Sequence, residues 1–332
     1  MTGKPEMSTK LIADAGIFAA LSIVLLLLAL YVPFLGLFAT FVWSVPLMIV
    51  VMRHHWWAGI LSGIVIFLGA VVLAGPVSGF LAALTIVGFG LTYGACFQHR
   101  VSPAKTFFLG TVITGLITGG TILAMTFLGS VPFTDLLNQA EAAIAQVLSS
   151  YESMGLLDNL LPAGMTAEEY SAQILAVFRM LLPAAFILAA MTTAAANYIF
   201  AGIILKRLNF YVRTLPPFRE WHVPWWMVWG VIIALISLFL GNRLENENLL
   251  IVTQNIFYIY MPIALISGLS LLAFLLHRYH VSRNVQIIFW VLYALFMTFT
   301  LPFTLFLGLF DMVIDYRKIF AGMKKRKDNK DK

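Results

Sequence analysis

Long apolar runs follow one another along almost the whole chain, separated by short segments that carry charge, proline or glycine. A run of about 18 apolar residues or more is long enough to cross a bilayer, and it does so as a helix because lipid offers the backbone no hydrogen-bond partners. We therefore predict an all-α polytopic transmembrane helical bundle with about eight to ten membrane segments. The predicted segments are 9–31, 36–52, 56–74, 78–97, 104–128, 171–205, 224–241, 249–276 and a final stretch at 285–320.

The final apolar stretch is too long for a single crossing. Residues 284–320 would form one helix about 55 Å long, whereas the hydrocarbon core of a bilayer is about 30 Å thick. Pro302 lies near the middle of this stretch, and proline disrupts a helix because it has no N–H to donate. We predict a terminal hairpin, or a re-entrant pair, of two short segments broken near Pro302.

The positive residues indicate the topology. The chain has 61% hydrophobic and only 11% charged residues, with a net charge of +6. Short cytoplasmic loops are enriched in Lys and Arg. If the N-terminus lies inside, the inner loops hold Arg53, Arg100, Lys105, Lys206, Arg207, Arg213, Arg219, Arg278 and Arg283. We expect a cell-membrane protein in contact with the lipid bilayer, with both termini cytoplasmic and with no nucleic-acid partner.

The segment 129–170 is predicted to lie outside, and it is acidic without any Lys or Arg. Between residues 133 and 150 its apolar residues recur at helical spacing, at Leu137, Ala140, Ile144, Val147 and Tyr151. This pattern is typical of a helix that lies on a membrane surface or caps a bundle. The alternative is a loosely ordered loop.

No sequence pattern of a soluble enzyme is present. The chain lacks a nucleotide-binding loop, a His/Glu zinc pattern and a serine-hydrolase elbow, and it has one cysteine, Cys96. Its histidines adjoin Arg or Trp in predicted inner loops, which favours a position at the headgroups over a metal site. We expect no catalytic residues, no metal, no cofactor and no enzymatic activity.

Ionisable groups within membrane segments are the best candidates for function, because each is costly in hydrocarbon. Arg179 lies about two turns into the segment 171–205, which a capping box at Thr166–Glu169 opens. On a helix, Arg179, Phe186, Ala190, Thr193 and Asn197 share one face. We interpret this stripe as one wall of a cavity open to the outside. The alternative is that Arg179 reaches the outer interface or pairs with an acid such as Glu169.

A second polar group lies in the segment 249–276, at a depth similar to that of Arg179. Gln254, Asn255 and Tyr258 are candidates for the opposite wall of a substrate-binding cavity, although polar residues that only join helices are as common. Near the C-terminus, Asp311 and Asp315 are one turn apart. We interpret them as an inner-interface pair with Arg317 or Lys318 rather than as a proton relay.

Small residues mark positions where helices approach closely. Gly59 and Gly63, and Gly115 and Gly119, form GxxxG pairs, and Ala15 and Ala19 form an AxxxA pair after the basic N-terminus. These are packing positions, unless they face outward and dock another membrane protein.

The chain resembles the YybS-type predicted membrane proteins of Gram-positive bacteria, whose function is unassigned. The likeness covers most of the chain and is carried by residues 9–16, by Tyr31-Val32-Pro33 and by residues 308–317, GLFDMVIDYR.

Residues 1–206 are also distantly similar to the S components of energy-coupling-factor transporters. That resemblance implies six helices, a ligand cavity open to the outside, and docking of a coupling transmembrane subunit with its ATPases on Ala15 and Ala19. The further segments at 207–320 and the basic cytoplasmic tail at 321–332 depart from this plan.

Two functions follow from these patterns. The first is a transport-type membrane protein that binds a small solute from outside. The other is a non-transporting scaffold or regulatory protein of the cell envelope, in which the polar groups only hold helices together.

Overall fold

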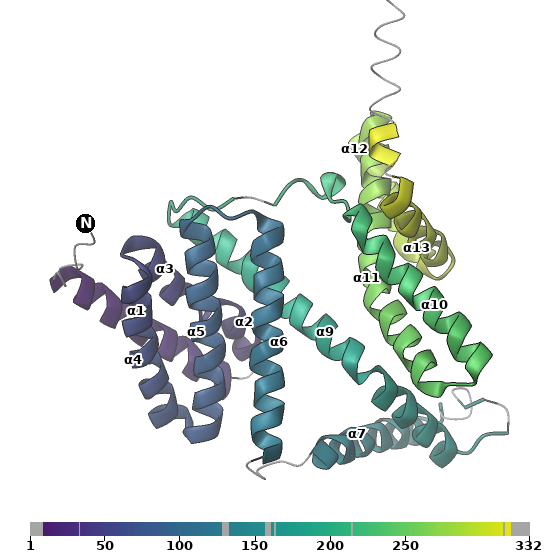
Figure 1. The fold of residues 1–332 in the computed structure, drawn as a ribbon, viewed down its shortest axis with the longest axis horizontal. Helices are drawn as coiled ribbons and strands as arrows, with labels where there is room; N and C mark the ends of the chain where they lie inside the picture. The colour runs from purple at the N-terminus through teal and green to yellow at the C-terminus, as the bar shows by residue number, and fades with distance from the viewer. Residues whose placement is uncertain are drawn as a thin grey trace, which may run out of the picture. The chain divides into compact units, whose positions relative to one another are not determined.

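A computed structural model describes residues 9–32, 34–127, 133–156, 161–162, 164–213, 215–314 and 316–319. These residues form helices and connecting segments, which confirms the predicted all-α fold (Figure 1). Within them, eight helices are long and apolar enough to cross a membrane, and two shorter apolar helices lie at Phe38–Arg53 and Arg283–Leu295. The chain divides into two compact units. The first comprises Met1–Leu175 and Phe186–Thr214, and the second Ala176–Ala185 and Leu215–Lys332.

The first unit is a helical bundle in which α4, α5 and α6 lie side by side (Figure 1). The predicted amphipathic segment at 133–150 is helical, so the loop alternative is wrong for these residues. The helices of this unit are α1 Thr9–Tyr31, α2 Leu35–Val42, α3 Val45–Arg53, α4 Trp56–Ala74, α5 Pro76–Gln98, α6 Pro103–Phe127, α7 Phe133–Ser153 and most of α9 Ala167–Arg207.

The predicted span at 36–52 is apolar and helical but not regular throughout, because the stretch Phe38–Arg53 is interrupted between α2 and α3. They meet at Trp43 and Ser44. Pro46 explains the break, since it cannot donate the helical hydrogen bond to the carbonyl of Val42. With eight and nine residues, each helix is less than about 15 Å long, too short to cross a bilayer alone.

Helix α3 lies at the centre of the first unit, and every residue from Val45 to Val51 is buried. It contributes to two apolar clusters. One joins α3 to α5 and α9 around Tyr93, whose hydroxyl donates to the carbonyl of Ala194 at 2.8 Å. The other joins α1, α4 and α5 around Leu47. The short α3 therefore acts as the core around which the longer helices pack.

The second unit is built on a close contact between α11 and α13. A methyl group at Gly268 would overlap the carbonyl oxygen of Thr304, and one at Gly308 would overlap that of Ala264. The two glycines thus allow the two backbones to touch, as small residues do between membrane helices. The elements of this unit are the short 3-10 helices η1 Phe218–Glu220 and η2 Trp225–Met227, followed by α10 Val228–Leu244, α11 Glu247–Arg278, α12 Arg283–Leu295 and α13 Met297–Ile314.

The last apolar stretch is broken, but not at the predicted position. Helix α12 ends at Leu295 and α13 begins at Met297, so the break lies at Phe296, while Pro302 stands inside α13. Pro302 is in the second turn of α13, where its missing N–H costs only the hydrogen bond to Thr298. The hydroxyl of Tyr293 donates to Oγ1 of Thr304 at 2.9 Å and joins the two helices.

Candidate functional site

The polar stripe predicted on one face of α9 is divided between the two units. Arg179 belongs to the part of α9 that packs with the second unit, whereas Phe186, Thr193 and Asn197 belong to the first. Gln254, Asn255 and Tyr258 are all in the second unit. The predicted residues therefore fall into two groups, which are considered separately.

Asn197 supports the core of the first unit. Its side chain is buried, donates to the carbonyl of Thr193 at 3.0 Å, and accepts from the hydroxyl of Ser44 at 3.4 Å. Ser44 is the residue at which the chain passes from α2 to α3. Asn197 therefore joins α9 to the break between these helices. Phe186 and Thr193 are half-buried.

The main polar feature of the second unit is the Asn255 carboxamide, which lies against α9 beside Pro183. Its Oδ1 accepts from the backbone N–H of Ala184, and its Nδ2 donates to the carbonyl of Met180, both at 2.8 Å. A regular helix would join that N–H directly to that carbonyl, four residues apart. The amide of Asn255 thus bridges a main-chain pair in the disrupted part of α9.

Arg179 stands next to this bridge. Pro183 lies four residues after it and cannot donate to its carbonyl. Its side chain is exposed, and in the part of the chain that the structure describes no hydrogen bond or ion pair involves it. The alternative acid, Glu169, instead accepts from the backbone N–H of Thr166 at 2.9 Å, in the predicted capping box.

The other two candidates on α11 are exposed. Gln254 and Tyr258 flank the buried Asn255 in sequence, and 44% of the Tyr258 side chain is accessible. The structure thus separates the three residues: Asn255 holds the fold together, whereas Gln254 and Tyr258 are free to meet lipid or a ligand.

Ala15 and Ala19 do not form an exposed docking surface, which corrects the prediction from the AxxxA pattern. Both are buried in the first unit, with accessibilities of 8% and 0%. The carbonyl of Ala15 accepts from the hydroxyl of Ser62 on α4 at 3.3 Å. Small residues on α1 admit α4 rather than a partner subunit.

The two GxxxG pairs differ in their surroundings. A methyl group at Gly59 would meet Val51 and Leu91, and one at Gly63 would meet Val87, so this pair lies at an internal contact. On α6, by contrast, a methyl group added at Gly115 would meet no described atom within 4 Å beyond the backbone of its own helix.

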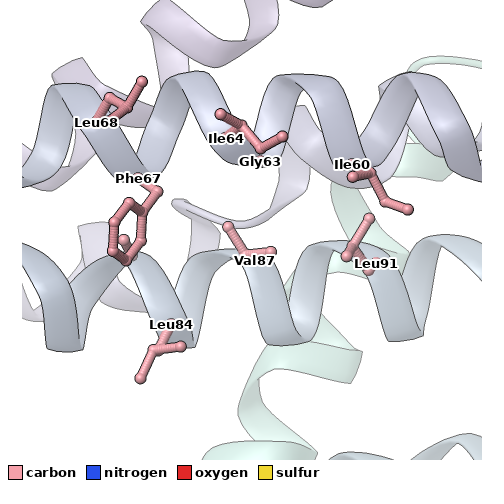
Figure 2. Close-up of a pocket in the computed structure, with 9 residues that line it drawn as sticks. Ile60, Gly63, Ile64, Phe67, Leu68, Leu84, Val87 and Leu91 are labelled. Atoms are coloured by element: carbon pink, nitrogen blue, oxygen red, sulfur yellow. The ribbon is translucent and has the colours of Figure 1, made fainter.

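A groove of about 250 Å³ lies between α4 and α5, with Gly63 on its wall (Figure 2). Its lining is entirely apolar, so it offers no group that could recognise a polar solute. The residues that line it are Ile60, Gly63, Ile64, Phe67, Leu68, Ala83, Leu84, Val87 and Leu91.

Asp311 and Arg317 form an ion pair in the second unit, which is one of the predicted pairings, and the pair is buried. Arg317 Nη2 lies 3.6 Å from Asp311 Oδ2, and the two side chains are 12% and 2% exposed. Arg317 also donates to the carbonyl of Arg219 and to the hydroxyl of Ser270, at 2.8 and 3.0 Å. Arg317, three residues beyond the end of α13, is thereby bonded to the backbone of η1. Asp315 and the basic tail at 321–332 lie outside the described residues.

A second ionic cluster was missed by the sequence reasoning. Asp14 Oδ2 on α1 lies 2.9 Å from His54 Nε2 and 3.8 Å from the guanidinium of Arg53 at the end of α3. That guanidinium also lies over the rings of Phe18 and Phe210. The signal was a single acid within the first apolar segment, which needs a cationic partner. Among the described residues, no group of three or more His, Cys, Asp and Glu is placed to bind a metal.

Comparison with known proteins gives the family of the chain. A family model described as a predicted membrane protein (DUF2232) matches residues 20–312. The chain is 24% identical over 287 residues to the "Uncharacterized protein YybS" of Bacillus subtilis (strain 168). The aligned region covers 84% of this chain and 89% of that protein. No solved structure matches significantly, and none of these comparisons shows a likeness to S components. The predicted YybS-type resemblance is confirmed, and the chain belongs to the DUF2232 family of predicted membrane proteins.

Proposed function

We propose that this protein is a transport-type protein of the cell membrane, and that it binds a small solute from the outer side through Arg179. The observation that carries the proposal is the exposed side chain of Arg179, four residues before Pro183 in α9. A charge in a membrane segment is costly, and residues of this kind commonly serve a substrate pathway.

The local backbone supports the same reading. Transporters commonly bind solutes where a membrane helix is interrupted, because backbone groups freed there can face a ligand. Pro183 frees the carbonyl of Arg179 from the helical pattern, and Asn255 holds the adjacent turn in place. A positive charge on the residue whose carbonyl lacks its helical donor suits a solute that carries a carboxylate or phosphate together with a hydrogen-bond donor.

The proposal includes the predicted orientation, with both termini cytoplasmic, and no catalytic activity. Of an S-component-like role for residues 1–206, the proposal keeps only the binding of a solute. A coupling subunit with ATPases would need a surface other than Ala15 and Ala19, because these residues are covered by α4.

The competing function is a non-transporting scaffold. It is favoured by one observation: Asn197 and Asn255, the two buried amides among the predicted residues, both bond to helix backbone. On this reading Arg179 only reaches the lipid headgroups.

Native mass spectrometry of the full chain in mild detergent separates the two functions. We expect wild type to retain a small molecule that Arg179→Ala loses and Arg179→Lys partly retains. Arg243→Ala is the matched control, because Arg243 is likewise an exposed arginine within a membrane helix and should not affect binding. An unliganded wild type, or a bound molecule equally retained by Arg179→Ala, would contradict the proposal.

A further inference from the structure

The chain folds back on the first unit at the end of α9, in a segment that we call the basic hook, residues 206–213. Phe210 and Val212 of the hook pack against the apolar cluster of α3, α5 and α9, in which Val212 is buried. The hydroxyl of Tyr198 on α9 donates to the carbonyl of Arg213 at 2.9 Å. The basic hook is therefore a fixed part of the first unit and not a free loop.

Two further loops reach the basic hook through contacts between arginines and its aromatic rings. The guanidinium of Arg100, between α5 and α6, lies 4.6 Å from the ring centre of Tyr211. The guanidinium of Arg53, at the end of α3, lies 5.6 Å from the ring centre of Phe210. Such a contact holds an arginine in place while its N–H groups can still bind a ligand. The structure thus brings basic segments that are far apart in the sequence to one end of the first unit.

The positive charge gathered at this end is not balanced by acidic residues. Segments 97–110 and 186–214 contain no Asp or Glu, and Asp14, beside Arg53, is already paired with His54. All Lys and Arg residues of the two segments are exposed, and within the described part of the chain no ion pair involves any of them. They are Arg100, Lys105, Lys206, Arg207 and Arg213. The positive-inside rule accounts for the sign of each loop, but it does not require the loops to meet.

An exposed apolar face of α9 leads directly to these charges. Ile199, Ile203 and Arg207 follow one another at intervals of four residues, so they share one side of the helix. The two isoleucines are 41% and 47% exposed, and Leu208 and Tyr211 in the hook are 49% and 59% exposed. A phospholipid has the same order of chemistry, with a hydrocarbon chain that ends in a phosphate. A free anion or an acidic protein would not require an apolar face that leads to the charges.

We propose that the basic hook is a binding site for an anionic phospholipid. The headgroup phosphate meets the guanidinium groups of Arg100, Arg207 and Arg213, and an acyl chain lies along Ile199 and Ile203. Arginine suits this role because its planar group donates two parallel hydrogen bonds to a phosphate. Anionic lipid is favoured over neutral lipid because it adds a further negative charge to a site that holds only cations.

Native mass spectrometry of the full chain in mild detergent, titrated with phosphatidylglycerol or with neutral phosphatidylcholine, tests the site. We expect phosphatidylglycerol to bind at least about tenfold more tightly. Arg207→Gln together with Arg213→Gln should weaken this binding on the order of 20-fold, since each cation near an anionic lipid contributes about fivefold. Arg207→Lys together with Arg213→Lys keeps the charge and should retain most of the binding. If the glutamine variant fails to accumulate, Arg100→Gln tests the same site from another loop.

The matched control is Arg243→Gln together with Arg283→Gln, which removes two exposed arginines from the second unit and leaves the same net charge. Its affinity for phosphatidylglycerol should stay within about twofold of wild type, because the hook is intact. Equal losses in the control and the hook variant, or equal binding of the two lipids, would overturn the proposal. Displacement of the lipid by an equal concentration of inorganic phosphate would also overturn it, since the site would then bind a free anion. Arg179 is unchanged in every variant, so the result is independent of solute binding there.

Discussion

The carboxamide of Asn255 bonds to both a backbone N–H and a backbone carbonyl of α9 beside Pro183. Its oxygen accepts from the N–H of Ala184, and its nitrogen donates to the carbonyl of Met180. A second hydrogen bond from the same nitrogen, to Ile251 of its own helix at 2.9 Å, sets the direction of the side chain. One buried amide thus bonds to two backbone groups of α9 that lie on either side of Pro183.

We expect Asn255→Leu to destabilise the protein by about 1 to 2 kcal/mol, because it leaves the Ala184 N–H and the Met180 carbonyl without this partner. Thermal unfolding in detergent measures the change as a lower Tm. Gln254→Leu is the control, since Gln254 is exposed next to Asn255 and should change stability by less than about 0.5 kcal/mol. Equal effects of the two substitutions would show that the bridge adds nothing.

The glycine contact between α11 and α13 gives a second prediction. Gly308→Ala should destabilise the protein by about 1 to 3 kcal/mol, because the added methyl group overlaps the carbonyl of Ala264 and forces the helices apart. The matched control is Gly115→Ala on α6, where the added methyl group would meet no described atom within 4 Å beyond the backbone of its own helix. There the substitution should be neutral or stabilising, since alanine favours the helix. A neutral Gly308→Ala would mean that α11 and α13 are less closely packed than described.

The Asp311–Arg317 pair gives a third prediction. Arg317→Met should lower stability by about 3 to 5 kcal/mol, because it leaves a buried carboxylate without its main cationic neighbour. Asp311→Leu combined with Arg317→Met should be less destabilised than the single Arg317→Met variant, since no buried charge then remains. Chemical denaturation of all variants completes the cycle. Arg283→Ala, at an exposed arginine of the same unit, is the control. If the loss of stability in the double variant equalled the sum of the losses in the two single variants, the two side chains would not interact.

The orientation in the membrane gives a fourth prediction. In the Cys96→Ala background, Ser153→Cys at the exposed end of α7 should react with an impermeant maleimide in intact cells. Tyr279→Cys, exposed between α11 and α12, should react only after permeabilisation, because the proposed orientation places the loops enriched in Lys and Arg in the cytoplasm. Labelling in the reverse order would invert the topology and move the Arg179 region inside.

The sequence by itself determined the helical membrane fold, because apolar length and backbone satisfaction in lipid leave one solution. It also indicated that Asp311 pairs with Arg317 or Lys318, since these charges lie close together along the chain, whereas the burial of the Asp311–Arg317 pair came from the structure. The positions of the helix breaks could be predicted from the sequence only in part. Pro46 interrupts the span at 36–52, whereas Pro302 is tolerated inside α13 and the chain bends at Phe296.

Only the tertiary structure decided what each polar residue contacts. Asn255 and Ala184 are 71 residues apart, and Ser44 and Asn197 are 153 apart. A helix that is apolar on all sides carries no pattern that marks its protein-facing side. The same limit explains why the docking prediction for Ala15 and Ala19 failed. Their spacing indicates a close helix contact but does not show which helix makes it. That neighbour is α4, because the rotation of each helix and its depth beside the next are set by packing over the whole bundle.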